Sequence, residues 1–114
     1  METKHSILKI YVSSTDKIGS EMVYEFIVHK AKKENIAGVT VFRGIMGYGK
    51  SSKISSSRFW ELTEKLPVTI EIIDETDKIN AFFNMIEPEL KKMEKGCIVT
   101  LEPVHILLSK QGKE

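Results

Sequence analysis

Few features of this sequence are typical of secreted, fibrous or membrane-spanning proteins. Its 114 residues include a single cysteine, Cys97, which excludes an internal disulfide and cannot alone build a cysteine metal site. Three prolines and seven glycines are ordinary counts that argue against a fibrous or disordered chain. No apolar run approaches the roughly 20 residues needed to cross a bilayer, and residues 1–5 lead into no signal-peptide core. We therefore expect a cytoplasmic protein.

The chain also lacks a large excess of charge of either sign. It has 17 basic and 16 acidic side chains, which give a formal net charge of +1 at pH 7. A protein that binds nucleic acid through its phosphates needs a strongly basic surface, so we expect no nucleic-acid partner. The length suits one globular domain, residues 1–114, with a single core.

Apolar, β-branched runs predict the strands of a sheet. These runs are Ile7–Val12, Val39–Phe42, Val68–Asp74 and a closing region of Cys97–Leu101 with Val104–Leu108. Pro103 is expected to interrupt the closing region. Several strands carry apolar residues at both even and odd positions, such as Ile72 and Ile73, so both faces of the sheet need cover. Packing against copies of the same chain would supply that cover, and we expect a homo-oligomer.

Two stretches have the three- and four-residue spacing of an amphipathic helix. The first extends from about Ile18 to Lys33, after a turn that ends at Asp16. The second runs from Ile79 to Met93, and Pro88 is expected to kink or restart it. The element order is therefore β-α-β, a loop, then β-α-β, which is the order of the ferredoxin-like fold. We expect an α+β domain with a mostly antiparallel sheet and both helices on one face.

Residues 51–57 contain five serines and form the only low-complexity stretch of the chain. They are too polar and too poor in helix formers to pack, so we expect a mobile loop. Residues 58–66 fit either an extended return or a short helix. Residues 110–114 are expected to form a polar tail.

Three glycines lie in the run from Gly44 to Gly49. Residues 44–51 satisfy the G-x-x-x-x-G-K-[ST] pattern of the phosphate-binding P-loop. A true P-loop opens into a helix that holds the phosphates, whereas the residues after Lys50 form helices poorly, so we expect no P-loop NTPase. Two interpretations stay open. The glycines shape a hairpin, or they let the backbone approach a ligand whose phosphate contacts Arg43 or Lys50.

Candidate residues for catalysis or metal binding are sparse. His5, His29 and His105 have no close mutual spacing, so one chain offers no metal site from them. Three copies of one histidine would meet only on the symmetry axis of a trimer. No nucleophile stands beside a base in the sequence, and we expect no enzymatic activity.

Several short motifs resemble a known family. They are Thr40-Val41-x-Arg43-Gly44-Ile45-x-Gly47-Tyr48-Gly49, Leu66-Pro67-Val68, Gly96-x-Ile98-Val99-Thr100-Leu101-Glu102, and Tyr24-Glu25 early in the first helix. From about Ile7 to Leu108 the sequence is similar to the PII-like family known as domain of unknown function 190. That family is related to the PII nitrogen-regulatory signal-transduction proteins. The resemblance implies a trimer of ferredoxin-like subunits, with an adenine nucleotide in each of three clefts between them.

The resemblance also implies which residues contact the nucleotide. They are Gly38, Thr40, Arg43, Gly44, Gly47, Tyr48, Gly49, Lys95, Gly96, Cys97, Ile98 and Lys110. Residues 44–49 correspond to the base of the PII T-loop, and residues 95–98 to the short B-loop before the last strand. Arg43 would hold phosphate or fix the loop base. The chain has fewer cations at these positions than PII proteins have, so AMP or ADP is expected rather than ATP.

The T-loop itself corresponds to residues 51–57. The resemblance implies that a ligand orders this segment, which then contacts a partner such as a membrane transporter or channel. The first hypothesis is therefore a PII-like regulator that signals through a mobile loop and requires no cofactor. The alternative is a trimeric divalent-metal-binding or metal-tolerance-type protein that binds no nucleotide.

Overall fold

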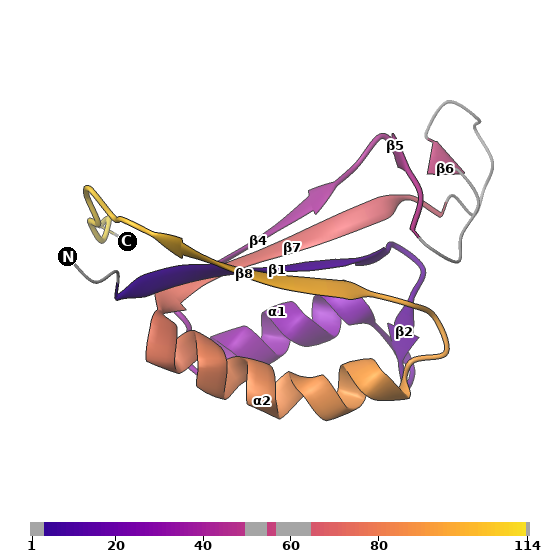
Figure 1. Cartoon of the computed structure of the whole chain (residues 1–114), viewed down its shortest axis with the longest axis horizontal. Helices are drawn as coiled ribbons and strands as arrows, with labels where there is room; N and C mark the ends of the chain where they lie inside the picture. Colours follow the sequence, from indigo (N-terminus) through magenta and orange to yellow (C-terminus); the bar gives the residue numbers. More distant parts are fainter. Residues whose placement is uncertain (1–3, 50–54, 57–64, 114) are drawn as a thin grey trace.

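The computed structural model describes residues 4–49, 55–56 and 65–113. A four-stranded antiparallel sheet forms one layer of the fold (Figure 1). Its strands are, in spatial order, β4 (Gly38–Arg43), β7 (Pro67–Glu75), β1 (His5–Ser13) and β8 (Ile98–Val104). β1 pairs with β7 on one side and with β8 on the other. β4 and β8 are therefore the two edges of the sheet.

Both helices form a second layer against one face of this sheet (Figure 1). They are α1 (Val23–Lys33) and α2 (Thr76–Lys92). Along β7 the side chains of Val68, Ile70 and Ile72 are buried beneath the helices, while their neighbours are only partly covered. The largest fully buried side chains are Ile10, Val23, Ile27, Ile70, Ile72, Ile79, Phe82 and Ile86. The predicted α+β fold, with an antiparallel sheet and two helices on one face, is confirmed. Neither helix is long and apolar enough to cross a membrane.

The first helix begins later than its spacing predicts. Residues 17–22 instead form a short hairpin of two strands, β2 (Lys17–Ile18) and β3 (Glu21–Met22). Gly19 adopts a φ of 63° between them, a left-handed conformation through which an α-helix cannot continue. Asp16 closes the turn before the hairpin, and its backbone carbonyl accepts the amide of Val23 at 2.9 Å. The helix therefore starts at Val23, and the predicted start at Ile18 is wrong.

Two prolines interrupt the structure less than the sequence predicts. α2 continues as one helix through Pro88, because one lost backbone hydrogen bond is offset by the buried side chains of Ile86 and Leu90. β8 likewise continues through Pro103. β8 is an edge strand, and the backbone groups on its outer side pair with no other described strand of the sheet, so a residue without an N–H is tolerated there. β8 then ends at Val104. The predicted strand region at 104–108 is therefore wrong beyond Val104.

The serine-rich segment lies largely outside the described residues. Ser55–Ser56 forms a short strand, β6, that pairs with β5 (Met46–Gly47). Residues 51–54 and 57–64 are not described, so the expected mobile loop at 51–57 stays a prediction, as does the extended return or short helix at 58–66. Residues 105–113 form neither helix nor strand.

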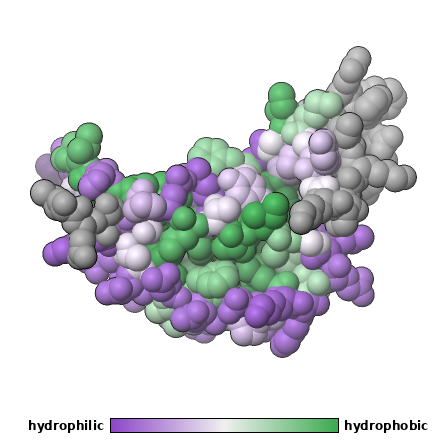
Figure 2. Space-filling view, in the orientation of Figure 1, coloured by the Kyte–Doolittle hydropathy of each residue, from purple (hydrophilic) through white to green (hydrophobic). Residues whose placement is uncertain are grey.

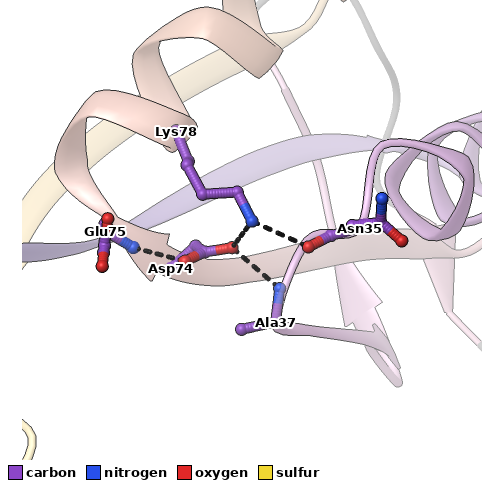
Figure 3. Close-up of polar contacts among 5 residues, drawn as sticks. All are labelled: Asn35, Ala37, Asp74, Glu75 and Lys78. Carbon is purple, nitrogen blue, oxygen red and sulfur yellow. Dashed lines mark hydrogen bonds and ion pairs between the residues drawn. The ribbon is translucent and has the colours of Figure 1, made fainter.

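Asp74 ties the end of β7 to the turn that follows α1 (Figure 3). Its carboxylate accepts the amides of Ala37 at 2.9 Å and Glu75 at 2.7 Å, and it pairs with Lys78 at 3.2 Å. Lys78 also donates to the backbone carbonyl of Asn35 at 2.8 Å. Burial alone would raise the pKa of Asp74, but these donors outweigh burial and hold the pKa below its ordinary value. This network fixes the point at which β4 begins.

We expect Asp74→Ala to lower the free energy of unfolding by about 2–4 kcal/mol, because it removes the acceptor of two backbone amides and the partner of Lys78. Asp77→Ala, an exposed change in the first turn of the same helix, is the matched control and should cost less than about 1 kcal/mol. Urea unfolding measures both values. Equal losses in the two variants would contradict the role assigned to Asp74.

The lowered pKa of Asp74 also predicts how stability changes in acid. A carboxyl whose pKa is lower in the folded state stabilises the fold above its ordinary pKa, and this contribution is lost as pH falls through the folded-state value. Asp74→Asn removes the titrating group. The difference in unfolding free energy between wild type and Asp74→Asn should therefore shrink as the pH falls through the ordinary aspartate pKa of 3.8 and below it. A difference that stays constant in urea unfolding across this range would refute the assignment.

Candidate functional site

The segment after β4 turns back against the start of β7. Gly44 donates its amide to the carbonyl of Pro67 at 2.7 Å, and the chain then enters β5. The side chains around this turn are exposed, Tyr48 to 75% of its surface. The predicted T-loop base is therefore a tight backbone turn surrounded by solvent-exposed side chains. It lies at the end of the sheet where β1 ends and β7 begins, which we call the loop end.

The space around Pro67 excludes a side chain at Gly44 and disfavours one at Gly47. A Cβ atom on Gly44 would lie 2.8 Å from Cγ of Pro67, and a Cβ on Gly47 would lie 3.2 Å from the same atom. Both distances are shorter than the optimal carbon–carbon separation of about 3.5–4.0 Å, and a proline ring cannot rotate away. The glycines thus allow the T-loop base to pack directly on the first residue of β7.

The predicted B-loop lies at the same loop end but beside the other edge of the sheet. Residues 95–98 connect α2 to the start of β8. Ile98 belongs to a cross-strand row that continues through Tyr11 and Thr69 to Phe42. Three strand spacings, about 14 Å, therefore separate Ile98 from Phe42, which comes just before the T-loop base. Within one subunit the two predicted loops do not form one cleft.

The remaining predicted residues join neither loop. Gly38 opens β4 at the far end of the sheet, opposite Ile73. Thr40 lies in the middle of β4, opposite Glu71. The C-terminal segment that carries Lys110 follows the far end of β8 (Figure 1). The structure therefore groups Arg43 with residues 44–49, and residues 95–98 with one another, but leaves these three apart.

The face of the sheet without helices combines apolar and charged rows. The apolar row exposes Phe42 to 50%, Tyr11 to 40% and Ile98 to 53%. The adjacent row contains Thr40, Glu71, Lys9 and Thr100. Lys9 pairs with Glu102 at 2.8 Å, and the hydrogen bond to this carboxylate raises the pKa of Lys9. Exposed aromatic and aliphatic side chains next to fixed charges suit contact with another protein surface.

A cavity that the sequence did not predict also lies at the loop end. Its volume is about 320 Å³, and its lining includes Lys17, Lys65, Lys92 and Lys95 together with Asp16 and Glu94. Three separate segments contribute these residues: the turn after β1, the start of β7 and the end of α2. Only Lys95 is among the predicted site residues. No local motif links lysines so far apart in sequence, so the fold alone brings them together.

The structure offers no metal centre within one described subunit. Among residues 4–49, 55–56 and 65–113, no three side chains of His, Cys, Asp or Glu are grouped to hold a metal ion. His29 instead contacts Glu21 at 2.9 Å on the surface. Burial, together with the nearby charge of Asp16, raises the pKa of the Cys97 thiol, so the unreactive thiol form dominates at neutral pH.

A protein-family model matches almost the whole chain. It is named DUF190, an uncharacterized family, and it covers residues 5–106. A UPF0166 protein from Aquifex aeolicus is 36% identical over 104 residues, which are 91% of this chain and 94% of that protein. A UPF0166 protein from Methanocaldococcus jannaschii is 40% identical over 77 residues, 68% of this chain and 70% of that protein.

Solved structures of PII-like proteins share the fold. One is CPII, a nitrogen regulatory PII-like protein from Thiomonas intermedia bound to ADP, AMP and bicarbonate; its TM-score is 0.60 at 14% identity, over 88% of this chain and 87% of that one. A candidate PII-like signaling protein from Thermus thermophilus has a TM-score of 0.63 at 16% identity, over 91% of both chains. Identities this low show a common fold and no more.

Gly44→Ala tests the close approach at the T-loop base. We expect the free energy of unfolding to fall by about 1–3 kcal/mol, because the new Cβ would lie 2.8 Å from Pro67. Gly112→Ala is the control, since its Cβ would meet nothing within 4 Å. Adding Pro67→Ala to Gly44→Ala removes the clashing Cγ and should recover part of the loss. Thermal unfolding measures these three variants and Pro67→Ala alone, and strictly additive losses in the double variant would argue against a direct clash.

Proposed function

The chain belongs to the DUF190 family, and from this membership we propose that it is a non-enzymatic, PII-like regulator that binds an adenine nucleotide. The nucleotide is AMP or ADP, it binds between copies of the chain, and its binding is signalled to a partner protein by the segment that follows the T-loop base. CPII, which shares the fold, is bound to ADP and AMP, and this supports the class of ligand.

The placement of the two predicted loops carries the proposal. The T-loop base and the B-loop lie at one end of the sheet, but beside opposite edges about 14 Å apart. A second copy that brings its β8 edge to the β4 edge of the first would place its residues 95–98 next to Arg43 and Tyr48. Each cleft would then contain a T-loop base from one copy and a B-loop from the next.

Two open surfaces support this association. The face without helices exposes the apolar row that ends at Phe42 and Ile98. Figure 2 shows a second hydrophobic band between β8 and α2. Along it Leu101 is exposed to 48%, and a groove of about 140 Å³ runs between Val99 and the α2 side chains Phe83 and Leu90. Burying such patches between subunits stabilises a chain of this size.

The side chains of the proposed cleft suit a nucleotide with few phosphates. Tyr48 and Ile98 are exposed and provide flat and apolar surfaces for a base. Arg43 is the cation at the end of β4, and Lys95 is the cation of the B-loop. AMP or ADP needs fewer cationic partners than ATP. We therefore propose that discrimination among nucleotides follows the number of phosphates.

Calorimetric titration with AMP, ADP, ATP and cyclic AMP tests the proposal. We expect AMP or ADP to bind with a dissociation constant of about 1–100 μM, and Arg43→Ala to weaken this binding about tenfold through the loss of a charge-assisted contact. Lys33→Ala changes an exposed cation at the end of α1 and should have no effect. Heat from none of the nucleotides, at concentrations that detect micromolar binding, would refute the proposed function.

A mixture of two variants tests whether the clefts are shared. Arg43→Ala damages the T-loop side of every cleft in its own trimer, and Lys95→Ala damages the B-loop side. Trimers refolded from both variants contain some clefts in which intact Arg43 faces intact Lys95 of another copy, so part of the AMP affinity should return. Light scattering should give three times the 13.0 kDa subunit mass. A mixture that binds AMP no better than its parents would show that one subunit supplies both sides.

A further inference from the structure

The cavity at the loop end has more positive charge than its own carboxylates balance. Four lysines contribute to its lining, Lys17, Lys65, Lys92 and Lys95. Only two carboxylates, those of Asp16 and Glu94, share the lining with them. The formal charge of these side chains at neutral pH is therefore positive, and it is concentrated on one concave surface.

Three of these lysines have no ion pair within the described part of the chain. Lys17, Lys65 and Lys95 lie more than 4.0 Å from every described carboxylate, although other lysines, such as Lys9 and Lys78, are paired. Lys92 contacts only Glu89, at 3.6 Å on the exposed surface of α2, and such surface pairs contribute little. The ammonium groups thus keep most of their capacity to bind an external anion.

The buried carboxylate of the cavity has a structural role. Asp16 is only 6% exposed, and its Oδ2 atom accepts the amide of Ser13 at 2.9 Å. This bond closes the turn between β1 and β2 and places Lys17 at the start of the short hairpin. Asp16 therefore positions one of the cations and does not neutralise it.

We propose that this cavity binds the phosphate group of a small molecule. A phosphate group has several oxygens that can accept hydrogen bonds from several ammonium groups at once. Its negative charge also reduces the electrostatic repulsion between those ammonium groups. A volume of about 320 Å³ is within the range of small-molecule sites, so the ligand is a phosphomonoester or diphosphate with a small organic part. Met93 lines the same cavity and provides an apolar contact for that part.

The phosphate has two possible sources, which share this chemistry. It belongs either to the adenine nucleotide of the proposed cleft or to a separate phosphorylated metabolite. The lining residues that the structure describes all belong to one subunit, so phosphate binding there does not rest on the proposed function. Failure of the nucleotide titrations would leave the second source intact.

Pyrophosphate is the probe for this site, because it supplies the phosphate chemistry without a base. We expect it to raise the unfolding temperature of the full chain and to give heat in calorimetry at low ionic strength. Lys17→Ala combined with Lys65→Ala should weaken the binding about tenfold. Lys32→Ala combined with Lys33→Ala removes the same charge from the end of α1, away from the cavity, and should leave the binding unchanged. Lys65→Arg keeps the charge and should bind as wild type does.

Competition with AMP identifies the source of the phosphate. Displacement of pyrophosphate by AMP assigns the cavity to the nucleotide, whereas simultaneous binding assigns it to a separate metabolite. The proposal is overturned if pyrophosphate gives no heat at millimolar concentration. It is also overturned if the two double variants lose affinity equally, because binding would then reflect overall charge and not this cavity.

Discussion

The contacts of Leu66 and Pro67 hold the loop end of this protein together. Leu66 is buried; its amide donates to Oγ of Ser14 at 3.0 Å, and its carbonyl accepts the amide of Ser14 at 2.8 Å. Pro67 accepts the amide of Gly44 at 2.7 Å, and its ring leaves no room for a Cβ atom at position 44. The turn after β1 and the T-loop base are thus fastened to two consecutive residues. The lysine cavity includes residues from the turn after β1 and Lys65, so it and the T-loop base lie on either side of this junction.

Most of the sheet and both helix faces could be predicted from the sequence, because hydrophobic spacing is a local property. The stripe from Ile79 to Leu90 indicates its helix without knowledge of anything else. The errors arose where a local rule competed with context. Ile18 has helical spacing, but the left-handed backbone of Gly19 excludes a helix there. Pro103 breaks a strand only if the strand has neighbours on both sides, and the order of strands is not written in the local sequence.

The candidate site was predictable only in part, and for a related reason. The glycines at 44 and 47 form a compact motif, so the sequence could single them out before their contact with Pro67 was known. Lys17 and Lys65 are separated by most of the first half of the chain, and only the pairing of β1 with β7 brings their segments to the same end of the sheet. A ligand that contacts both lysines would bind only the folded state of the chain. It would shift the conformations of the loops only as far as its affinities for those conformations differ.

The positions of the two sheet edges determine which half of the proposed cleft a second copy of the chain must contribute. β4 leads into the T-loop base and β8 leads out of the B-loop, so the two halves of the proposed cleft face outward from opposite edges. A contact between unlike edges is heterologous, and it forms a closed assembly only when the rotation between copies returns to its start, as in a ring of three. Lys9 and Glu102 place fixed charges beside the apolar row of Tyr11 and Ile98. A copy that slid along the face would bury those charges against apolar side chains at a cost in free energy. In the proposed assembly, the alternation of rows therefore favours one register of association over a register shifted along the face.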